Sequence, residues 1–494
     1  MTTRREALTR LSVGAVATFA GVAPGLRAIA GPLPIRKEIN GLALNHPDVT
    51  TLRDGVRILK GRPAGSPNWT DLATIHGTPA GFNKCPHRNW YFVAWHRAYL
   101  LMYERIIRAA TGNTSFAMPF WDWTAHPAVP QAYSQPTYNG QPNPLYVAQR
   151  NNGYVVPTTV AGPSVMNTIY NVDTVFEKFG TSRPAGQNSL SPSWITSMTG
   201  LQGTLEGTPH NSIHVGLGGF MPNGNSPMDP IFLMHHGNID HIWWTWNCKG
   251  RPNTSDNLWR DMAFANTFYN PTGTGTWTTH PSQLLDIATL GYSYGACVGR
   301  LVLGSVRTLA NARLLEIYKT GTTEAAQAAG FQALTLKAQV NRGVLDAVAP
   351  EPRERLKGAL DNSLVEGAAN PTAQQQAGSD VIALIHNLTP PNPGVEVLVF
   401  VGAGAIPDAA DAGDSHYVQT IGFFGVGDGM MDGHAMSGGV AAQVDLTAAL
   451  RASTGGLPAT DEIRVHLVAR PVAGGTQADA EATVANAQVE VAIV

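Results

Sequence analysis

Six of the fifteen histidines fall into two groups whose spacing suits metal binding. His76, His87 and His96 form the first group, and His96 lies inside a segment with helical periodicity. In the second group, His210 and His214 stand at positions i and i+4, so both imidazoles can reach one ion from the same helical face. A lone histidine is more often a hydrogen-bonded core or surface residue. The metal interpretation therefore depends on both groups occurring together.

His236, on another predicted helix, completes the second group. Its neighbour His235 points roughly 100 degrees away around that helix, so we expect only one of the two to face the same metal. Two sites of three neutral nitrogens, without a carboxylate at comparable spacing, suit copper best among the metals that bind imidazole. A di-iron bundle would use Glu-x-x-His motifs. A zinc peptidase would have glutamate after its first histidine, where this chain has Asn211.

The elements expected to hold these histidines are helical. Apolar residues recur at intervals of three and four between Trp90 and Ala110, which predicts a helix with one buried face. A second helix is expected from Ile231 to Trp246. A shorter one should begin near Pro209, because proline fits the first turn of a helix. The 52 glycines and 34 prolines indicate long loops between these helices.

Length and composition indicate a large core domain with at least one smaller unit, because 494 residues exceed what one hydrophobic core usually serves. The net charge of −2, without a basic run beyond the first residues, argues against nucleic acid or stable membrane association. Three cysteines, Cys85, Cys248 and Cys297, are too few for a disulfide framework and too scattered for a thiolate metal site. We interpret the last two as structural.

The N-terminal segment has the features of an export signal. Paired arginines at positions 4 and 5 precede a moderately apolar stretch over 11–22 and a small-residue site ending at Ala30. This order predicts a twin-arginine signal peptide over 1–30, and hence a periplasmic or secreted protein. The alternative is a disordered basic terminus. The apolar stretch is too short to span a bilayer.

Beyond a mainly α-helical core over 31–295, the sequence pattern changes twice. The segment 296–378 has helical periodicity in Val306–Tyr318 and Glu324–Ala347, and we interpret it as a helical connector. Alternating Val, Ile and Leu then predict an antiparallel β-sandwich domain over 379–494. Its expected strands are 381–385, 395–401, 440–446, 463–468 and 489–494.

Several segments between Pro32 and Tyr294 resemble the type-3 copper family of tyrosinases, catechol oxidases and hemocyanins. Residues 92–100, FVAWHRAYL, are similar to the helix that binds the first copper, and residues 228–240, MDPIFLMHHGNID, to the helix that binds the second. Residues 119–123, PFWDW, fit the aromatic segment between them, and YSY at 292–294 is similar to the motif that closes the core. The tyrosinase and polyphenol oxidase branch, in its plant form, is the most similar.

This resemblance implies two copper ions in a four-helix bundle, each with three ligands: His76, His87 and His96 for one, and His210, His214 and His236 for the other. It also implies a thioether between Cys85 and His87, since a cysteine two residues before this ligand forms that link in fungal, plant-like and molluscan relatives. The link would hold His87 rigid. A free buried cysteine is the alternative.

Further roles follow from the same resemblance. Glu206 corresponds to the glutamate that holds a water in plant polyphenol oxidases, and Asn211 to the residue that helps activate that water. Such a water could accept the proton of a phenol, which favours hydroxylation of monophenols. A solvated first-turn glutamate and a capping asparagine are the alternatives.

Five other residues are candidates for shaping the site. Asn223 stands where some catechol oxidases have a bulky aromatic over the copper, which predicts an open entrance. Phe92 and Phe232, each four residues before a ligand, should pack on imidazoles, although core packing would explain them equally. Arg97 and Asp240 are expected to orient ligand rings or tie helices together.

The implied activity is oxidation of o-diphenols to o-quinones by molecular oxygen, with ortho-hydroxylation of monophenols, and o-aminophenols form a third plausible substrate class. The alternative is a hemocyanin-like oxygen-binding protein without turnover. Residues 395–400, VEVLVF, resemble the β-domain that shields plant polyphenol oxidases. The intact chain would then be latent until an activating protease cleaves the connector between Pro350 and Gln376.

Overall fold

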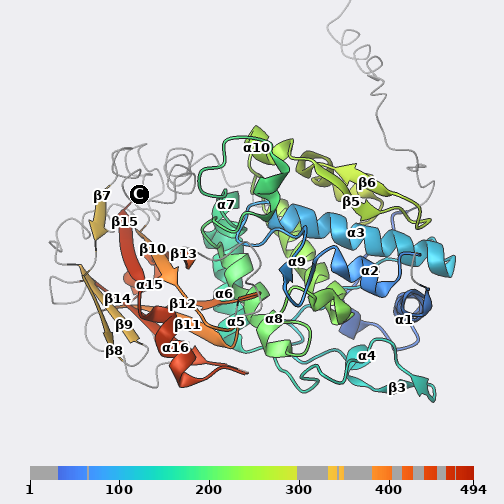
Figure 1. The fold of residues 1–494 in the computed structure, drawn as a ribbon, viewed down its shortest axis with the longest axis horizontal. Helices are drawn as coiled ribbons and strands as arrows, with labels where there is room; N and C mark the ends of the chain where they lie inside the picture. The colour runs from blue at the N-terminus through green and yellow to red at the C-terminus, as the bar shows by residue number, and fades with distance from the viewer. Residues whose placement is uncertain are drawn as a thin grey trace, which may run out of the picture. The chain divides into compact units, whose positions relative to one another are not determined.

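The two long helices of the core confirm the prediction from apolar periodicity. Helix α3 runs from Phe92 to Thr111 and helix α9 from Ile231 to Cys248, and the two pack against each other (Figure 1). Helix α3 ends at Gly112, whose φ of 72° is the left-handed C-cap conformation that glycine adopts without a steric penalty. Most of α9 is buried, polar residues included, so this helix lies in the centre of the core.

The computed structural model describes residues 32–63, 66–297, 332–335, 337–341, 344–349, 381–402, 414, 416–426, 439–452, 463–472 and 474–493. The predicted signal peptide over 1–30 and most of the connector over 296–378 lie outside these residues. Pro34–Val494 form one unit. Among the described residues, no helix combines the length and apolar character needed to cross a membrane.

Shorter elements and loops surround the two long helices. The remaining helices of the core are η1 (Ile39–Gly41), α1 (Pro47–Gly61), α2 (Trp69–Thr74), α4 (Gln131–Ser134), α5 (Thr158–Ala161), α6 (Pro163–Asn167), η2 (Thr168–Val172), α7 (Phe176–Phe179), η3 (Pro192–Thr196), η4 (Glu206–Asn211), α8 (Ser212–Leu217), η5 (Ser226–Met228), α10 (Asn257–Arg260), η6 (Pro281–Leu284) and α11 (Ile287–Leu290). Three two-stranded sheets join them: β1 (Gly77–Thr78) with β2 (Gly81–Phe82), β3 (Thr137–Tyr138) with β4 (Gln141–Pro142), and β5 (Phe264–Tyr269) with β6 (Thr276–Thr279).

The short helix predicted near Pro209 is present, but it is irregular. A π-helical turn, η4, is interrupted at Thr208, whose backbone is extended, and the Thr208–Pro209 peptide bond is cis. Regular α-helix resumes in α8 at Ser212. His210 and His214 therefore lie on either side of the change from η4 to α8.

The C-terminal region is an antiparallel β-sandwich, as predicted. A four-stranded sheet has the order β13-β10-β15-β7 and a five-stranded sheet the order β12-β11-β14-β9-β8. The strands that match the prediction are β10 (Val381–Leu388), β11 (Val395–Gly402), β13 (Val440–Asp445), β14 (Ile463–Pro471) and β15 (Gln488–Ile493). Strand β12 (Tyr417–Gly422) and helices α15 (Thr447–Ala452) and α16 (Gln477–Val484) were not predicted.

The helical prediction for Glu324–Ala347 is wrong wherever the structure describes it. Residues 332–335, 337–341 and 344–349 are strands β7, β8 and β9, and β7 pairs with β15 while β9 pairs with β14. Short apolar runs are ambiguous between helix and strand, and here the free edges of two sheets supply backbone partners. The helix predicted over Val306–Tyr318 lies outside the described residues.

Alternation along the strands builds the core of the sandwich. Val397 and Val399 of β11 join one apolar cluster with Val381 and Ala383 of β10, as expected for residues two apart on one face. The intervening residues, such as Leu398, are also fully buried. Both faces of these central strands are therefore covered, which explains their nearly continuous hydrophobic runs.

A disulfide joins Cys248 and Cys297, the two cysteines interpreted as structural from the sequence. Cys248 is the last residue of α9, so the bridge ties this helix to the end of the core. We expect Cys248→Ser to lower the free energy of unfolding by about 2–4 kcal/mol, because the bridge closes a loop with a sequence separation of 49 residues. Urea unfolding measures the loss. Reduction of the unmodified protein should reproduce it, and equal stability of both forms would contradict it.

The sandwich docks on the core through the edge strand β13. The Gln202 backbone N–H donates to the Ala441 carbonyl at 2.9 Å, and the Gln443 N–H donates to the Gln202 carbonyl at 3.4 Å. Lys178 of α7 forms a buried ion pair with Asp445 of β13. Backbone pairing and a buried ion pair thus fix the contact between the two regions.

Candidate metal centre

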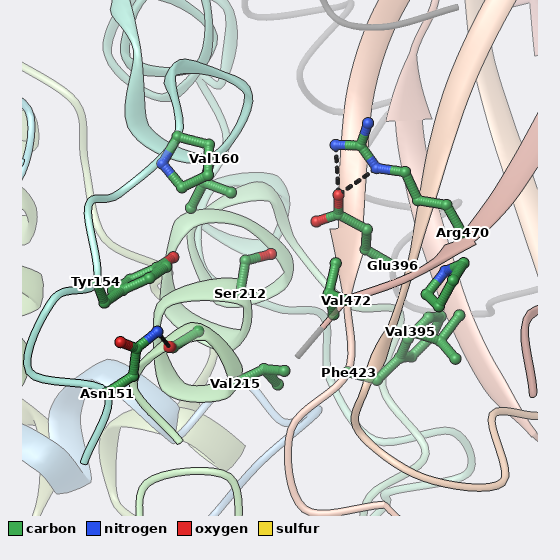
Figure 2. A pocket seen from close by; sticks show the side chains of 14 residues that line it. Asn151, Tyr154, Val160, Ser212, Val215, Val395, Glu396, Phe423, Arg470 and Val472 are labelled. Atoms are coloured by element: carbon green, nitrogen blue, oxygen red, sulfur yellow. Dashed lines mark hydrogen bonds and ion pairs between the residues drawn. The ribbon is translucent and has the colours of Figure 1, made fainter. Parts of the chain in front are cut away.

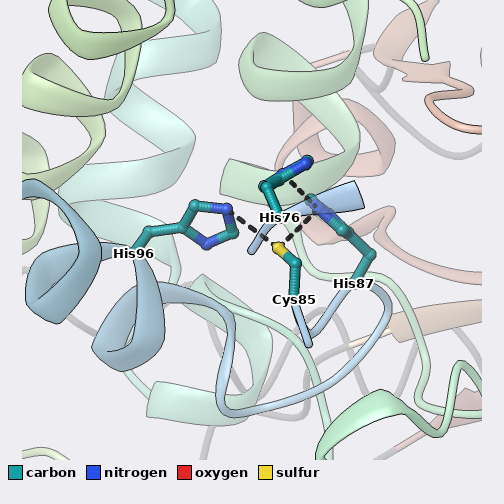
Figure 3. A group of neighbouring side chains, drawn as sticks. All are labelled: His76, Cys85, His87 and His96. Atoms are coloured by element: carbon teal, nitrogen blue, oxygen red, sulfur yellow. Dashed lines mark hydrogen bonds between the residues drawn. The ribbon is translucent and has the colours of Figure 1, made fainter. Parts of the chain in front are cut away.

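The structure brings the six predicted ligand histidines together in two buried groups. In the first group His76, Cys85, His87 and His96 each offer one ligand atom, and these atoms lie within 4.8 Å of one another (Figure 3). His76 follows α2, Cys85 and His87 precede α3, and His96 lies one turn into α3. The Nε2 atoms of His76 and His87 are 3.3 Å apart.

The second group contains His210, His214, His235 and His236, again with ligand atoms within 4.8 Å of one another. The Nε2 atom of His236 lies 3.3 Å from that of His210 and 3.1 Å from that of His214. His235 was expected to point away, but one of its ring nitrogens also lies within 4.8 Å of the other ligand atoms. The His235 ring centroid is 4.6 Å from that of His214, and Trp123 packs on it at 5.0 Å. That only one of His235 and His236 faces the metal stays a prediction.

Hydrogen bonds orient four of the six ligand rings. An oxygen atom accepts from the Nδ1 of each, which selects the tautomer that leaves Nε2 free for a metal ion. The pairs are His76 with the Gly224 carbonyl at 2.6 Å, His96 with the Phe92 carbonyl at 2.8 Å, His214 with the Met221 carbonyl at 2.7 Å, and His210 with the Asn211 side-chain oxygen at 2.8 Å.

Burial keeps all six rings in the form that binds metal. Removal from water lowers the pKa of each histidine, to about 3 for His76 and His210. Neutral imidazoles are the ligand form, so no proton competes with a metal ion near neutral pH. The donor set is therefore compatible with copper binding.

Cys85 lies beside two of the ligand histidines, as the predicted thioether to His87 requires. Its Sγ atom is 3.1 Å from Nε2 of His87 and 3.2 Å from Nε2 of His96. The side chain is buried and forms no disulfide. The covalent link remains a prediction.

Glu206 and Asn211 lie beside the two groups and form hydrogen bonds with neighbouring residues. One Glu206 oxygen accepts from the Arg88 backbone N–H at 2.6 Å, and the other accepts from the Thr181 hydroxyl. Burial raises the pKa of Glu206 to about 7. The Asn211 amide donates to the Gly422 carbonyl of β12 at 3.0 Å.

Phe92 and Phe232 pack on ligand histidines as predicted, whereas Asn223 does not. The Phe232 ring stacks on His236 at a centroid distance of 4.1 Å, and Phe92 packs on His96 at 4.8 Å. Asn223 is exposed, on the turn that ends at Ser226. That turn carries the carbonyl that holds His76.

Asp240 and Arg97 tie helices together rather than orient ligand rings. Arg97 of α3 donates to Asp240 of α9 at 2.5 Å, and Arg36 donates to the same carboxylate at 2.9 Å. The hydroxyls of Tyr292 and Tyr294 also donate to it, at 2.8 and 2.7 Å. Burial opposes ionisation, but the two guanidinium groups lower the pKa of Asp240.

We expect Asp240→Asn to reduce the free energy of unfolding by about 3–5 kcal/mol, because it leaves the buried Arg97 guanidinium without its counter-charge. Denaturant titration measures this loss. Asp54→Asn is the matched control, because Asp54 forms an exposed ion pair with Arg57 that contributes at most about 1 kcal/mol. Equal losses in the two variants would contradict the role of Asp240.

The sequence did not reveal that a phenylalanine from the sandwich covers the metal centre. The Phe424 ring, just beyond β12, stacks on His214 at a centroid distance of 4.0 Å and lies 5.0 Å from His87. Gly422 allows this approach, because a Cβ there would lie 2.4 Å from the Ser212 hydroxyl oxygen. Phe82 packs beside Phe424 at 5.3 Å.

Comparisons with known proteins agree with this geometry. Residues 66–249 match the family model described as the common central domain of tyrosinase. Tyrosinase HcTyr1 of Hahella sp. (strain CCB-MM4) is 31% identical over 207 residues, which are 37% of this chain and 42% of that protein. The (+)-larreatricin hydroxylase of Larrea tridentata is 30% identical over 230 residues, covering 42% of this chain and 38% of its own length.

Solved structures show the same fold over nearly the whole chain. Latent apple tyrosinase has a TM-score of 0.62 at 19% identity and covers 94% of this chain and 96% of its own. Recombinant latent aurone synthase, a polyphenol oxidase, has a TM-score of 0.63 at 17% identity, with 93% and 88% covered.

The chain therefore carries the central domain of the tyrosinase family. Polyphenol oxidases are among the proteins that match it in sequence and in fold. The matches span about two fifths of the length of the curated relatives.

Proposed function

We propose that this protein is a copper-dependent oxidase that converts o-diphenols to o-quinones with molecular oxygen. The observation that carries the proposal is the pair of buried histidine groups, with their Nε2 atoms brought together and four rings held through Nδ1. When bound, the two copper ions would supply oxygen activation and accept the electrons of the substrate. The protein itself supplies coordination geometry and buries the ligand rings.

Hydroxylation of monophenols would draw on Glu206 and Asn211. With a pKa of about 7, Glu206 suits transfer of a phenol proton near neutral pH. In the intact chain the Asn211 amide donates to Gly422, so removal of the sandwich would free it to polarise a water.

In the proteolytically activated enzyme, we expect Glu206→Gln to slow hydroxylation of a monophenol by about 100-fold, in line with the usual contribution of a general base. Catechol oxidation in the same variant is the internal control and should fall far less, because catechols transfer their protons more readily. Initial rates of quinone formation from the monophenol and from the catechol measure the two losses separately. An equal loss of rate in both reactions would show that Glu206 acts only structurally, by accepting the hydrogen bond of the Arg88 backbone N–H beside His87.

Latency is part of the proposal. Phe424 occupies the space over His214 and His87, and the sandwich that carries it docks on the core through β13. A protease that cuts within the predicted site between 350 and 376 would release the segment that carries Phe424 once β9 and β7, which precede the cut, separate from β14 and β15. We also propose the thioether at Cys85 and export over the twin-arginine route, which suits a chain with a disulfide.

The alternative function is oxygen binding without turnover, as in hemocyanin. The Phe424 cover favours it, because a shielded copper pair can bind oxygen while it excludes phenols. Quinone production from a catechol after limited proteolysis would exclude this alternative. Reversible oxygen uptake without any quinone would establish it.

A further inference from the structure

A cavity of about 370 Å³ lies where the helical core meets the sandwich (Figure 2). Tyr154, Val160 and Ser212 line it from the core, and Glu396 and Arg470 line it from the sandwich. Its volume falls within the range of about 300–1,000 Å³ that is common for small-molecule sites. It lies apart from the histidines, none of which lines it.

The Ser212 hydroxyl is the unexplained polar group in this wall. The residue is 8% exposed, and among the described residues its Oγ atom has no hydrogen-bond partner. Figure 2 shows the hydroxyl directed towards the side of Glu396. The Oγ atom packs against Gly422 and is closed off from solvent, so a ligand can hydrogen-bond to it only when the hydroxyl turns about the Cα–Cβ bond into the cavity. A buried hydroxyl without a partner costs about 1–3 kcal/mol, and such a bond would recover that free energy.

The charges in the cavity cancel each other. Arg470 donates from Nε and Nη2 to one oxygen of Glu396, each at 2.5 Å. A charged ligand would gain no net attraction from this pair and would lose its own hydration. The remaining walls are largely apolar and include the Tyr154 and Phe423 rings. The site therefore suits an uncharged molecule with an aromatic body and a single hydroxyl.

We propose that this cavity binds a small uncharged phenol, and that binding holds the sandwich on the core. This proposal rests on the proposed function in one respect: it assumes that phenols are the compounds on which the protein acts. Because the ligand touches both walls, it binds the covered form more tightly than the uncovered form. Linkage then requires that it shift the population towards the covered form.

The cavity is connected to the metal centre through β12. Gly422 and Phe423 line the cavity, and the next residue, Phe424, covers His214. Gly422 also accepts the hydrogen bond of the Asn211 amide. A phenol in the cavity would thus inhibit the intact chain without touching copper.

The test uses the copper-loaded intact protein and 2,6-dimethylphenol, whose blocked ortho positions exclude ortho-hydroxylation. Calorimetric titration should show one site per chain. Val472→Phe, which fills the cavity, should weaken binding at least tenfold, whereas the matched change at an exposed position, Val155→Phe, should leave it unchanged. Ser212→Ala, a gentler change, should weaken binding two- to tenfold.

The second readout is catechol oxidation by the intact chain. At ten times its dissociation constant, the phenol should lower the rate about tenfold in the unmodified protein and have little effect in Val472→Phe. Binding that is unchanged in both cavity variants would overturn the site, and equal binding of 1-hexanol would overturn the aromatic class. If no catechol is oxidised at all, the proposed function fails, while the titration still decides on the cavity.

Discussion

The Phe424→Ala variant of the intact chain should oxidise catechol about 10 to 100 times faster than the unmodified protein. The Phe424 ring is buried over His214 and lies 5.5 Å from His210, so it occupies the space that a substrate ring needs. Burying a phenylalanine side chain contributes about 1.5–3 kcal/mol to the covered state. Loss of this contribution would shift the equilibrium from the covered towards the uncovered form by about 10- to 100-fold.

Initial rates of quinone formation at saturating catechol measure this effect. The control is the proteolysed enzyme, in which the substitution should make no difference because the sandwich has left. Unchanged rates in the intact variant, at unchanged copper content, would show that Phe424 does not limit access.

His96→Ala should remove one of the two copper ions and reduce catechol oxidation by about a thousandfold or more. Its ring stacks on His236 at a centroid distance of 4.2 Å, so it stands where the two groups face each other. Loss of one ion would remove several kcal/mol of stabilisation from the reaction, which corresponds to this factor. Metal analysis and quinone formation measure both effects.

A matched histidine tests whether the effect belongs to the site. His126 is half exposed and lies outside both groups, so His126→Ala should keep both copper ions and full activity. If His96→Ala kept two ions per chain, His96 would not be a ligand.

The residues that local sequence pattern could identify are those whose spacing is set by one element. Helices α3 and α9 were predicted within two residues at each end, because their apolar positions repeat with the helical period. The i, i+4 spacing of His210 and His214 likewise predicted the second group, because residues four apart share one face of a helix. The strands of the sandwich followed from alternation.

Features that depend on docking could not be predicted in this way. Phe424 follows a strand with no motif, and only tertiary packing places its ring on His214. The partners of Cys248 and of β9 are likewise set by the chain's path, not by neighbouring residues. His235 lies closer to the second group than the helical wheel predicts, and its ring packs against Trp123.

The most direct test of the account is to measure copper content and quinone formation together on copper-loaded protein, before and after limited proteolysis. We expect two copper ions per chain, oxygen uptake with slow quinone formation from a catechol before cleavage, and a marked rise after it. Two bound ions without quinone from either a catechol or a monophenol, even after cleavage, would contradict the oxidase proposal.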